Sequence, residues 1–212
     1  MRTYYNRIAG QSLERLAALS DGIFAVAMTL LVLDLHIPVS TISNPITNDA
    51  ELWRALIKLV PNLLPYLMSF LTLGIFWVGQ QTQLNHFTRS NRNLTWLHLA
   101  FLLAVTLMPF STGLLAAFIT FRLAIVVYWL NIILLGTMLF VSWRYAQHAQ
   151  FMKDEVTAEI FSANERRILI AQSLYAFGAL LCIINTYVSI GFIVLVQLNY
   201  AIAPRFGLLE RL

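Results

Sequence analysis

A 22-residue apolar segment near the start of the chain, Leu16 to Ile37, most constrains how this protein can fold. As an α-helix it would be about 33 Å long, enough to cross a hydrocarbon core of about 30 Å. It nevertheless contains Ser20, Asp21 and Asp34. Ionisable side chains inside a membrane span are costly and usually face protein or a water path. We therefore predict a membrane helix whose polar side chains have a structural or functional role.

The helical periodicity of this segment separates an apolar face from a polar one. The apolar face contains one hydroxyl among aliphatic side chains: Val26, Thr29, Leu30 and Leu33. At about 100° per residue, Ser20 and Asp21 lie about 120° and 140° from Val26, on opposite sides. Arg15 precedes Asp21 by six residues, a spacing that does not place two side chains on one face. We therefore expect Arg15 and Asp21 each to find a partner on another helix.

The composition extends this prediction to the whole chain. Hydrophobic residues make up 59% of it and charged residues only 11%, against about a quarter charged in soluble domains. We therefore predict an all-α integral membrane protein, with residues 1–212 forming a single unit of six transmembrane helices. The predicted spans are residues 16–37, 59–80, 94–117, 123–143, 168–187 and 188–203, with one long hydrophilic segment at about residues 144–167.

The distribution of lysine and arginine predicts the orientation in the membrane. With the N-terminus in the cytoplasm, the inner side receives three in the lead, two between spans two and three, four in the long segment and two in the tail, eleven of the fourteen. This asymmetry predicts a multi-pass protein of the cell (plasma) membrane with both termini cytoplasmic. Because the basic residues lie between apolar runs, without interleaved aromatic residues, we expect no nucleic acid partner.

Catalysis finds little support in the sequence. It contains no G-x-x-x-x-G-K-[ST] phosphate loop, no H-E-x-x-H and no C-x-x-C motif. Cys182 is the only cysteine, so an intrachain disulfide and a cysteine metal site are both excluded. Asp21 and Asp34 lie about 20 Å apart along one helix, too far to act as a catalytic pair. We expect no enzymatic activity, no metal site and no cofactor.

The first helix carries a motif that resembles a known family. Its residues Arg15, Leu19, Ser20 and Asp21 resemble the R-x-x-x-F-S-D motif on the first helix of the endosomal and lysosomal potassium channel family, in its prokaryotic single-repeat branch. Leu19 replaces the phenylalanine of the motif. Similarity continues through Leu63 to Trp77 and through Asn93 to Phe110. The resemblance thus covers about the first half of the chain.

This resemblance implies a homotetramer of six-helix chains in which the first helices line a central pore. The family places its apolar pore constriction at the positions of Val26, Leu30 and Leu33, and links the position of Thr29 to selectivity. Four such helices would form stacked apolar rings, which hinder water and ions where they are narrow. Without the resemblance, the apolar residues would be ordinary helix packing and Thr29 would bond to its own helix. The TVGYG selectivity loop of other potassium channels is absent.

For the polar residues of the first helix we predict a structural network. A buried carboxylate needs hydrogen-bond donors from its neighbours to offset its desolvation. The residues assigned to this network are Arg15, Ser20, Asp21, Trp77, Gln80, Gln81 and His98, with Trp96 as a further candidate. In the family, histidines commonly occupy the positions of Gln80 and Gln81.

Our interpretation is a potassium-preferring cation channel, leak-like because no voltage-sensing arginine helix or ligand-binding domain is visible. Its expected partners are other copies of the chain, membrane lipid and permeant monovalent cations. Two alternatives remain open at this point. One is a proton-coupled transporter, which would require Asp21 to reach water and titrate. The other is a non-conducting membrane interaction protein.

Overall fold

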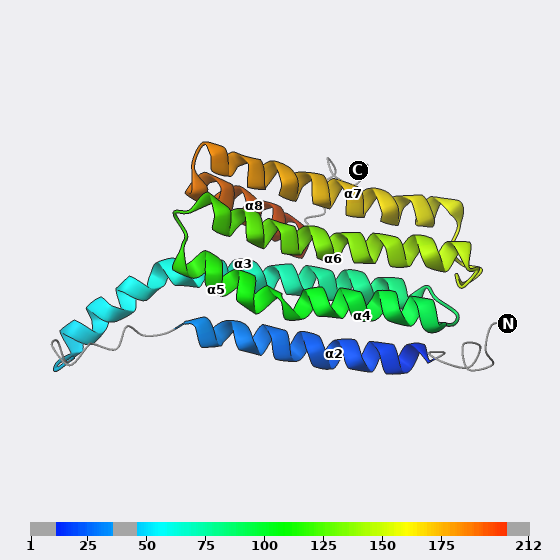
Figure 1. Cartoon of the computed structure of the whole chain (residues 1–212), viewed down its shortest axis with the longest axis horizontal. Coiled ribbons are helices and arrows are strands. Elements are labelled where there is room, and N and C mark those ends of the chain that lie inside the picture. Colours follow the sequence, from blue (N-terminus) through cyan, green and yellow to red (C-terminus); the bar gives the residue numbers. More distant parts are fainter. Residues whose placement is uncertain (1–11, 36–45, 203–212) are drawn as a thin grey trace.

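The structure, a computed structural model, describes residues 12–35 and 46–202, and its helices run along one axis as a bundle (Figure 1). In chain order they are α2 (Leu13–Leu30), the 3-10 helix η1 (Leu31–Asp34), α3 (Asp49–Asn85), α4 (Arg92–Thr106), α5 (Met108–Ala117), α6 (Arg122–His148), α7 (Ala158–Leu180), the 3-10 helix η2 (Leu181–Ile183) and α8 (Thr186–Ile202). The described ranges contain one isolated antiparallel bridge, Phe87 to Met152, outside any strand.

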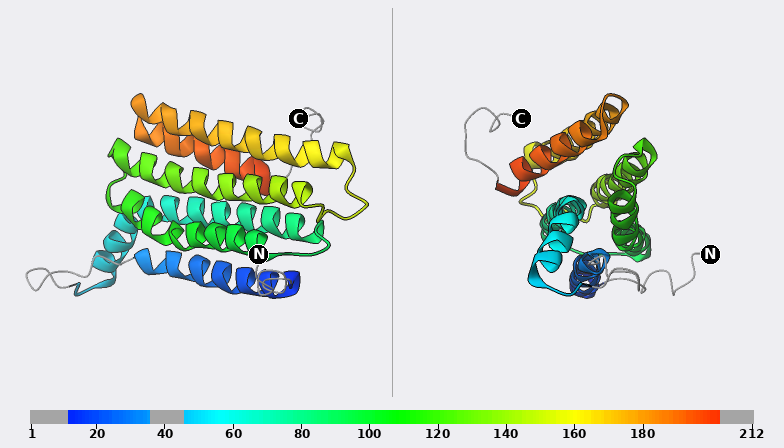
Figure 2. Two further views of the ribbon diagram at one scale, coloured as in Figure 1. Left: turned by 45° about the vertical axis from the view of Figure 1, so that its right-hand side comes forward. Right: turned by 90° about the vertical axis from the view of Figure 1, so that its left-hand side faces the viewer.

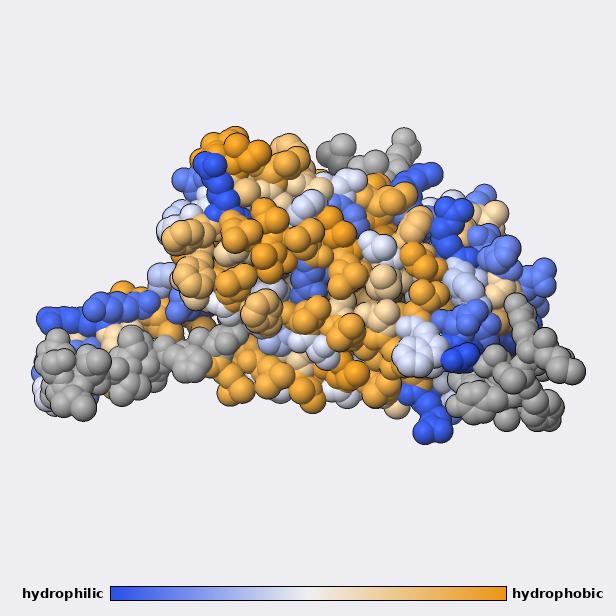
Figure 3. Space-filling model, viewed as in Figure 1, coloured by the Kyte–Doolittle hydropathy of each residue, from blue (hydrophilic) through white to orange (hydrophobic). Residues whose placement is uncertain are grey.

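The length and hydropathy of the helices are those of a membrane protein. Among the described residues, five helical segments are long and apolar enough to cross a membrane, and α8 is a shorter apolar helix of 17 residues. The space-filling view shows apolar side chains over the middle of the bundle and hydrophilic ones toward its ends (Figure 3). The prediction of an all-helical membrane protein is therefore confirmed.

The second predicted span differs from the structure at its start. The span was predicted to begin at residue 59, but the structure has one helix of 37 residues, Asp49–Asn85. The side chain of Asn48 caps it by accepting a hydrogen bond from the backbone N–H of Glu51 at 3.0 Å. Pro61 and Pro65 therefore lie inside α3. The first part of α3 leaves the bundle at an angle (Figure 1), as expected where proline removes backbone hydrogen bonds.

The third predicted span, residues 94–117, is broken in two near Pro109. α4 ends at Thr106, and α5 begins with Pro109 in its first turn. Asn131 of α6 bridges the break: with its amide turned so that both atoms have complementary partners, the nitrogen lies 3.0 Å from the carbonyl oxygen of Ala104 and the oxygen 3.2 Å from the backbone nitrogen of Met108. The side chain thus satisfies the two backbone groups that a continuous helix would pair with each other.

The remaining helices cover the predicted spans, but α6 ends five residues later than predicted and α7 begins ten residues earlier. α6 extends to His148 and α7 begins at Ala158, so both helices continue into the long hydrophilic segment. The turn before α8 falls at residues 184–185, slightly earlier than predicted. The end-on view in Figure 2 shows α2 at one edge of the bundle, with α7 and α8 at the opposite edge.

Candidate functional site

One face of α2 packs against its own chain. Its buried residues recur every three or four positions and make a single stripe: Leu16, Ser20, Phe24, Ala27 and, in η1, Leu31. The ring of Phe24 lies 5.9 Å from that of Phe101 on α4, measured between centroids. This stripe fixes the rotation of α2 about its axis, and so determines which residues point away from the bundle.

The opposite face of α2 is uncovered within the chain. Val26 is 57% exposed, Leu30 43% and Leu33 62%. Thr29 is exposed on the same face, and its hydroxyl donates to the carbonyl oxygen of Val26 at 2.8 Å. Two open apolar hollows lie beside these exposed residues; Thr106 lines one of them and Phe110 the other. The predicted constriction and selectivity residues thus share one surface that this chain leaves bare.

Ser20 anchors the buried face of α2 to two other helices. Its hydroxyl oxygen lies 2.6 Å from Nε2 of His98 on α4 and 3.1 Å from the amide nitrogen of Gln80 on α3. The Gln80 nitrogen also lies 3.2 Å from Nε2 of His98. All three residues are at most 5% exposed. These contacts connect α2, α3 and α4 to one another.

These distances select one protonation state of the imidazole. The Gln80 amide nitrogen can only donate, so the nitrogen of His98 that faces it must accept. A neutral His98 with its proton on Nδ1 accepts from Gln80, while the Ser20 hydroxyl lies within hydrogen-bond distance of both Nε2 of His98 and the carbonyl oxygen of Leu16, 2.8 Å away. An imidazolium would instead place a second N–H against the amide N–H. The cluster is therefore built around a neutral histidine.

Asp21 makes a second connection beside the first. One carboxylate oxygen of Asp21 accepts from the indole N–H of Trp77 at 2.8 Å and from the amide N–H of Gln81 at 2.7 Å. Trp77 and Gln81 are four residues apart on α3 and so lie on one face of that helix. Charge-assisted hydrogen bonds of this kind are shorter and stronger than neutral ones. Asp21 therefore binds α2 to α3 through neutral donors.

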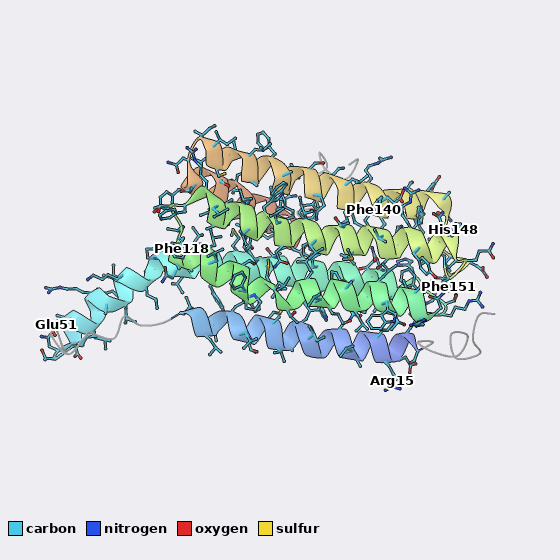
Figure 4. The ribbon with its side chains drawn as sticks, in the orientation of Figure 1. Arg15, Glu51, Phe118, Phe140, His148 and Phe151 are labelled. Carbon is cyan, nitrogen blue, oxygen red and sulfur yellow. The ribbon has the colours of Figure 1, made fainter. Side chains whose placement is uncertain are left out.

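Three residues considered from the sequence lie outside these clusters or outside the described side chains. Arg15 points away from the bundle (Figure 4), and within the described ranges of this chain its side chain forms no ion pair, so the partner predicted on another helix is not found there. Trp96 is 61% exposed and contacts neither cluster. The side chain of Asp34 is outside the described structure.

A larger polar cluster in the middle of the bundle was missed from the sequence. The hydroxyl of Tyr128 on α6 lies 3.0 Å from that of Thr72 and 3.3 Å from that of Ser69, both on α3. Thr72 also accepts from the amide of Gln197 on α8 at 2.6 Å, and Ser69 from Thr112 on α5 at 2.6 Å. Isolated polar residues within apolar runs were its only signal in the sequence.

Comparison with known families and proteins points in one direction. The model of the family described as endosomal/lysosomal potassium channel TMEM175 matches residues 15–109. A potassium channel of Chamaesiphon minutus is 26% identical over 192 residues, which cover 89% of this chain and 93% of that protein. A potassium channel of Streptomyces collinus is 36% identical over 105 residues, 50% of this chain and 48% of that protein, so the chain matches about half the length of this relative.

A vertebrate relative and a solved structure extend the comparison. The endosomal/lysosomal proton channel TMEM175 of Danio rerio is 36% identical over 84 residues, 38% of this chain and 16% of that protein. The crystal structure of a lysosomal potassium-selective channel TMEM175 homolog from Chamaesiphon minutus superimposes with a TM-score of 0.77 at 25% identity, covering 91% of this chain and 98% of that one. The similarity in structure thus includes the helices beyond residue 109.

Proposed function

We propose that this chain is a potassium-preferring cation channel of leak-like character, because the model of the endosomal/lysosomal potassium channel TMEM175 family matches residues 15–109 and the structure of a TMEM175 homolog superimposes on most of the chain. The exposed stripe of α2 carries the proposal, because it is a continuous apolar face that the chain does not cover itself. In a homotetramer, four copies of this face meet around a central pore. Two of the relatives are named potassium channels, which supports potassium as the permeant ion.

In such a tetramer, Val26, Leu30 and Leu33 form three stacked apolar rings. Apolar rings hinder ions because a narrow apolar passage loses its water. The three side chains are exposed within one chain, so they are free to meet their counterparts across an axis. We therefore assign the pore constriction to these positions.

Thr29 contributes a hydroxyl group to the exposed face of α2, and we assign it as the selectivity residue. Its hydrogen donates to the carbonyl of Val26 at 2.8 Å, which leaves the lone pairs of its oxygen available to a cation. The backbone carbonyls of a continuous helix are already engaged in helical bonds. A ring of four side-chain oxygens therefore replaces the ring of backbone carbonyls, and modest selectivity follows.

The two clusters on α2 set the position of the pore helix. Ser20 lies inside the chain, and Asp21 accepts two N–H donors from α3, so neither belongs to the exposed stripe. This arrangement supports a positioning role for Asp21 over the proton-coupled carrier.

We further assign residues 1–212 to one six-span unit in the plasma membrane with both termini in the cytoplasm. The excess of lysine and arginine on the side of the N-terminus supports this orientation. Permeation needs no resident cofactor in this mechanism, because potassium itself is the ion that passes through the pore.

A flux assay tests the proposal directly. Purified protein is reconstituted into liposomes, and flux is measured along a potassium gradient and then along matched sodium and caesium gradients. A channel gives a potassium flux that does not saturate over the concentration range, with slower sodium flux. A current that saturates and requires a proton gradient would support the carrier instead, and the absence of flux from a well-folded tetramer would contradict both.

A further inference from the structure

A separate cavity lies on the side of the bundle opposite the exposed face of α2. It has a volume of about 70 Å³ and is open at its mouth. Its walls come from α3, α6, α7 and α8. On α7 the lining residues follow one helical face from the first turns inward: Asn164, Arg167, Ile168, Ala171, Gln172 and Tyr175.

Polar atoms in this cavity lack partners among the described residues. Tyr175 is 1% exposed, lines the cavity, and its hydroxyl makes no hydrogen bond. The amide nitrogen of Asn164 and the amide oxygen of Gln172 are also buried without a partner. Buried polar groups are normally satisfied, so the two donors among these atoms, on Asn164 and Tyr175, indicate an occupant that accepts hydrogen bonds.

The charge of the lining favours an anion. Arg167 is the one charged residue of the lining, with its guanidinium carbon 5.9 Å from the centroid of the Tyr200 ring. The neighbouring Glu165 is directed to Arg144, 3.4 Å away. Arg167 is also the last charged residue of α7 before its apolar stretch begins at Ile168. Its guanidinium therefore lies near the level where a membrane has its phosphate groups.

Two glycines make the space available. A side chain at Gly136 of α6 would overlap the amide of Gln172, so glycine lets that amide lie against α6 and leave the cavity open. At Gly79 of α3, an added Cβ would find its nearest neighbour, a methyl group of Leu139, at 3.9 Å. The cavity therefore borders Gly79 with room for further atoms.

We propose that this cavity binds the phosphate headgroup of a phospholipid from the leaflet on the N-terminal side of the bundle. The guanidinium of Arg167 and the amide N–H of Asn164 donate to the phosphate, and the Tyr175 hydroxyl donates to an ester oxygen deeper in the cavity. One acyl chain lies against Ile75, Phe76 and Ile168. Basic pockets between helices recognise lipid headgroups in this way. The proposal does not depend on ion conduction.

Native mass spectrometry of the detergent-purified protein tests this binding. The protein is titrated with dioleoyl phosphatidylglycerol and, separately, with dioleoylglycerol, which has the same chains and no phosphate. We expect the phosphatidylglycerol to bind at least about ten-fold more tightly, as a charge-assisted bond provides. Arg167→Gln should remove that difference. Arg166→Gln changes an exposed neighbouring arginine that does not line the cavity, and should leave it unchanged.

Further variants locate the lipid within the cavity. Gly79→Leu should abolish the preference by filling the space, whereas Gly74→Leu, the same change on α3 outside the cavity lining, should preserve it. Tyr175→Phe should weaken binding about three-fold, as loss of one hydrogen bond predicts. Equal losses in Arg166→Gln and Arg167→Gln would overturn the proposal in favour of general surface charge. Displacement of the lipid by an equal concentration of inorganic phosphate would overturn it in favour of a free-phosphate site.

Discussion

α2 and α6 are both long apolar helices, yet they use their surfaces in opposite ways. We compared an 18-residue apolar segment of each helix. In α6, 44% of the residues of this segment are buried, whereas in α2 only 28% are. Two polar residues of α6 find their partners in the same chain: Tyr128 bonds to α3, and Asn131 bridges α4 and α5. α2 buries one stripe and leaves Val26, Leu30 and Leu33 bare.

The difference shows how an edge helix is held in place. Apolar packing has little driving force in lipid, because the lipid tails are themselves apolar, so interhelical hydrogen bonds contribute to specific association. α6 combines such bonds with neighbours on several sides. α2 has fewer neighbours, and its position relies on the bonds made by Ser20 and Asp21. Changes in the α2 clusters should therefore affect assembly more than comparable changes in α6.

The largest expected effect is that of Asp21→Ala. It leaves the indole of Trp77 and the amide of Gln81 without their acceptor, and each bond to a charged group contributes about 1.5–3 kcal/mol. We expect the recovery of tetramer, measured by light scattering after size-exclusion chromatography, to fall by at least about ten-fold. Asp21→Asn is the matched control, since its amide oxygen can still accept both bonds. A normal Asp21→Ala tetramer with altered ion preference would contradict the positioning role.

Leu30→Asn is expected to have the next largest effect. A polar ring attracts water into the constriction, so the leak of potassium from proteoliposomes should rise severalfold. The matched control is Leu130→Asn on α6, where the leucine is 52% exposed, against 43% for Leu30. If both variants leak equally, the rise reflects a general disturbance of the helices. Unchanged flux from intact Leu30→Asn protein would show that the bare face of α2 is not the pore.

A smaller effect is expected from Thr29→Val, which removes the hydroxyl while keeping the shape of the side chain. Among residues 12–35 and 46–202, the hydroxyl bonds to the Val26 carbonyl of its own helix alone, so assembly should be unchanged. The ratio of potassium to sodium flux should fall by about five-fold if the hydroxyl contributes about 1 kcal/mol to that preference. Thr29→Ser keeps the hydroxyl and should retain most of the ratio. Equal ratios in all three proteins would remove Thr29 from the selectivity mechanism.

Much of the fold could be predicted because lipid imposes a simple rule: apolar runs of sufficient length become helices. The rule is weaker where a helix leaves the membrane. α3 starts at Asp49, well before its apolar part, and the signal for that start was the capping residue Asn48 three positions before Glu51. The break near Pro109 is explained by the chemistry of proline. The contact of Asn131 with the two sides of that break depends on how α6 packs against α4 and α5, which the sequence does not show.

Some features of the candidate site could likewise be predicted from the sequence, and others could not. The two faces of α2 could be separated from the sequence, because residue spacing within one helix determines them. The candidate partners Trp77, Gln80, Gln81 and His98 do meet Ser20 or Asp21, but which donor meets which acceptor depends on the rotation of three helices. Tyr128 and Gln197 are 69 residues apart on different helices, and no local pattern relates them.

The smallest expected effects come from removing one hydroxyl from each region. Tyr128→Phe leaves Thr72 bonded to Gln197 and Ser69 bonded to Thr112, so its cost should be close to the average of about 0.6 kcal/mol for interhelical bonds in membranes. Ser20→Ala leaves His98 with Gln80 alone, and should cost more, up to about 1.7 kcal/mol. The two midpoints of thermal unfolding, measured in one detergent, decide the order. A lower midpoint for Tyr128→Phe than for Ser20→Ala would mean that the interior of the bundle, and not the anchoring of α2, limits the stability of the chain.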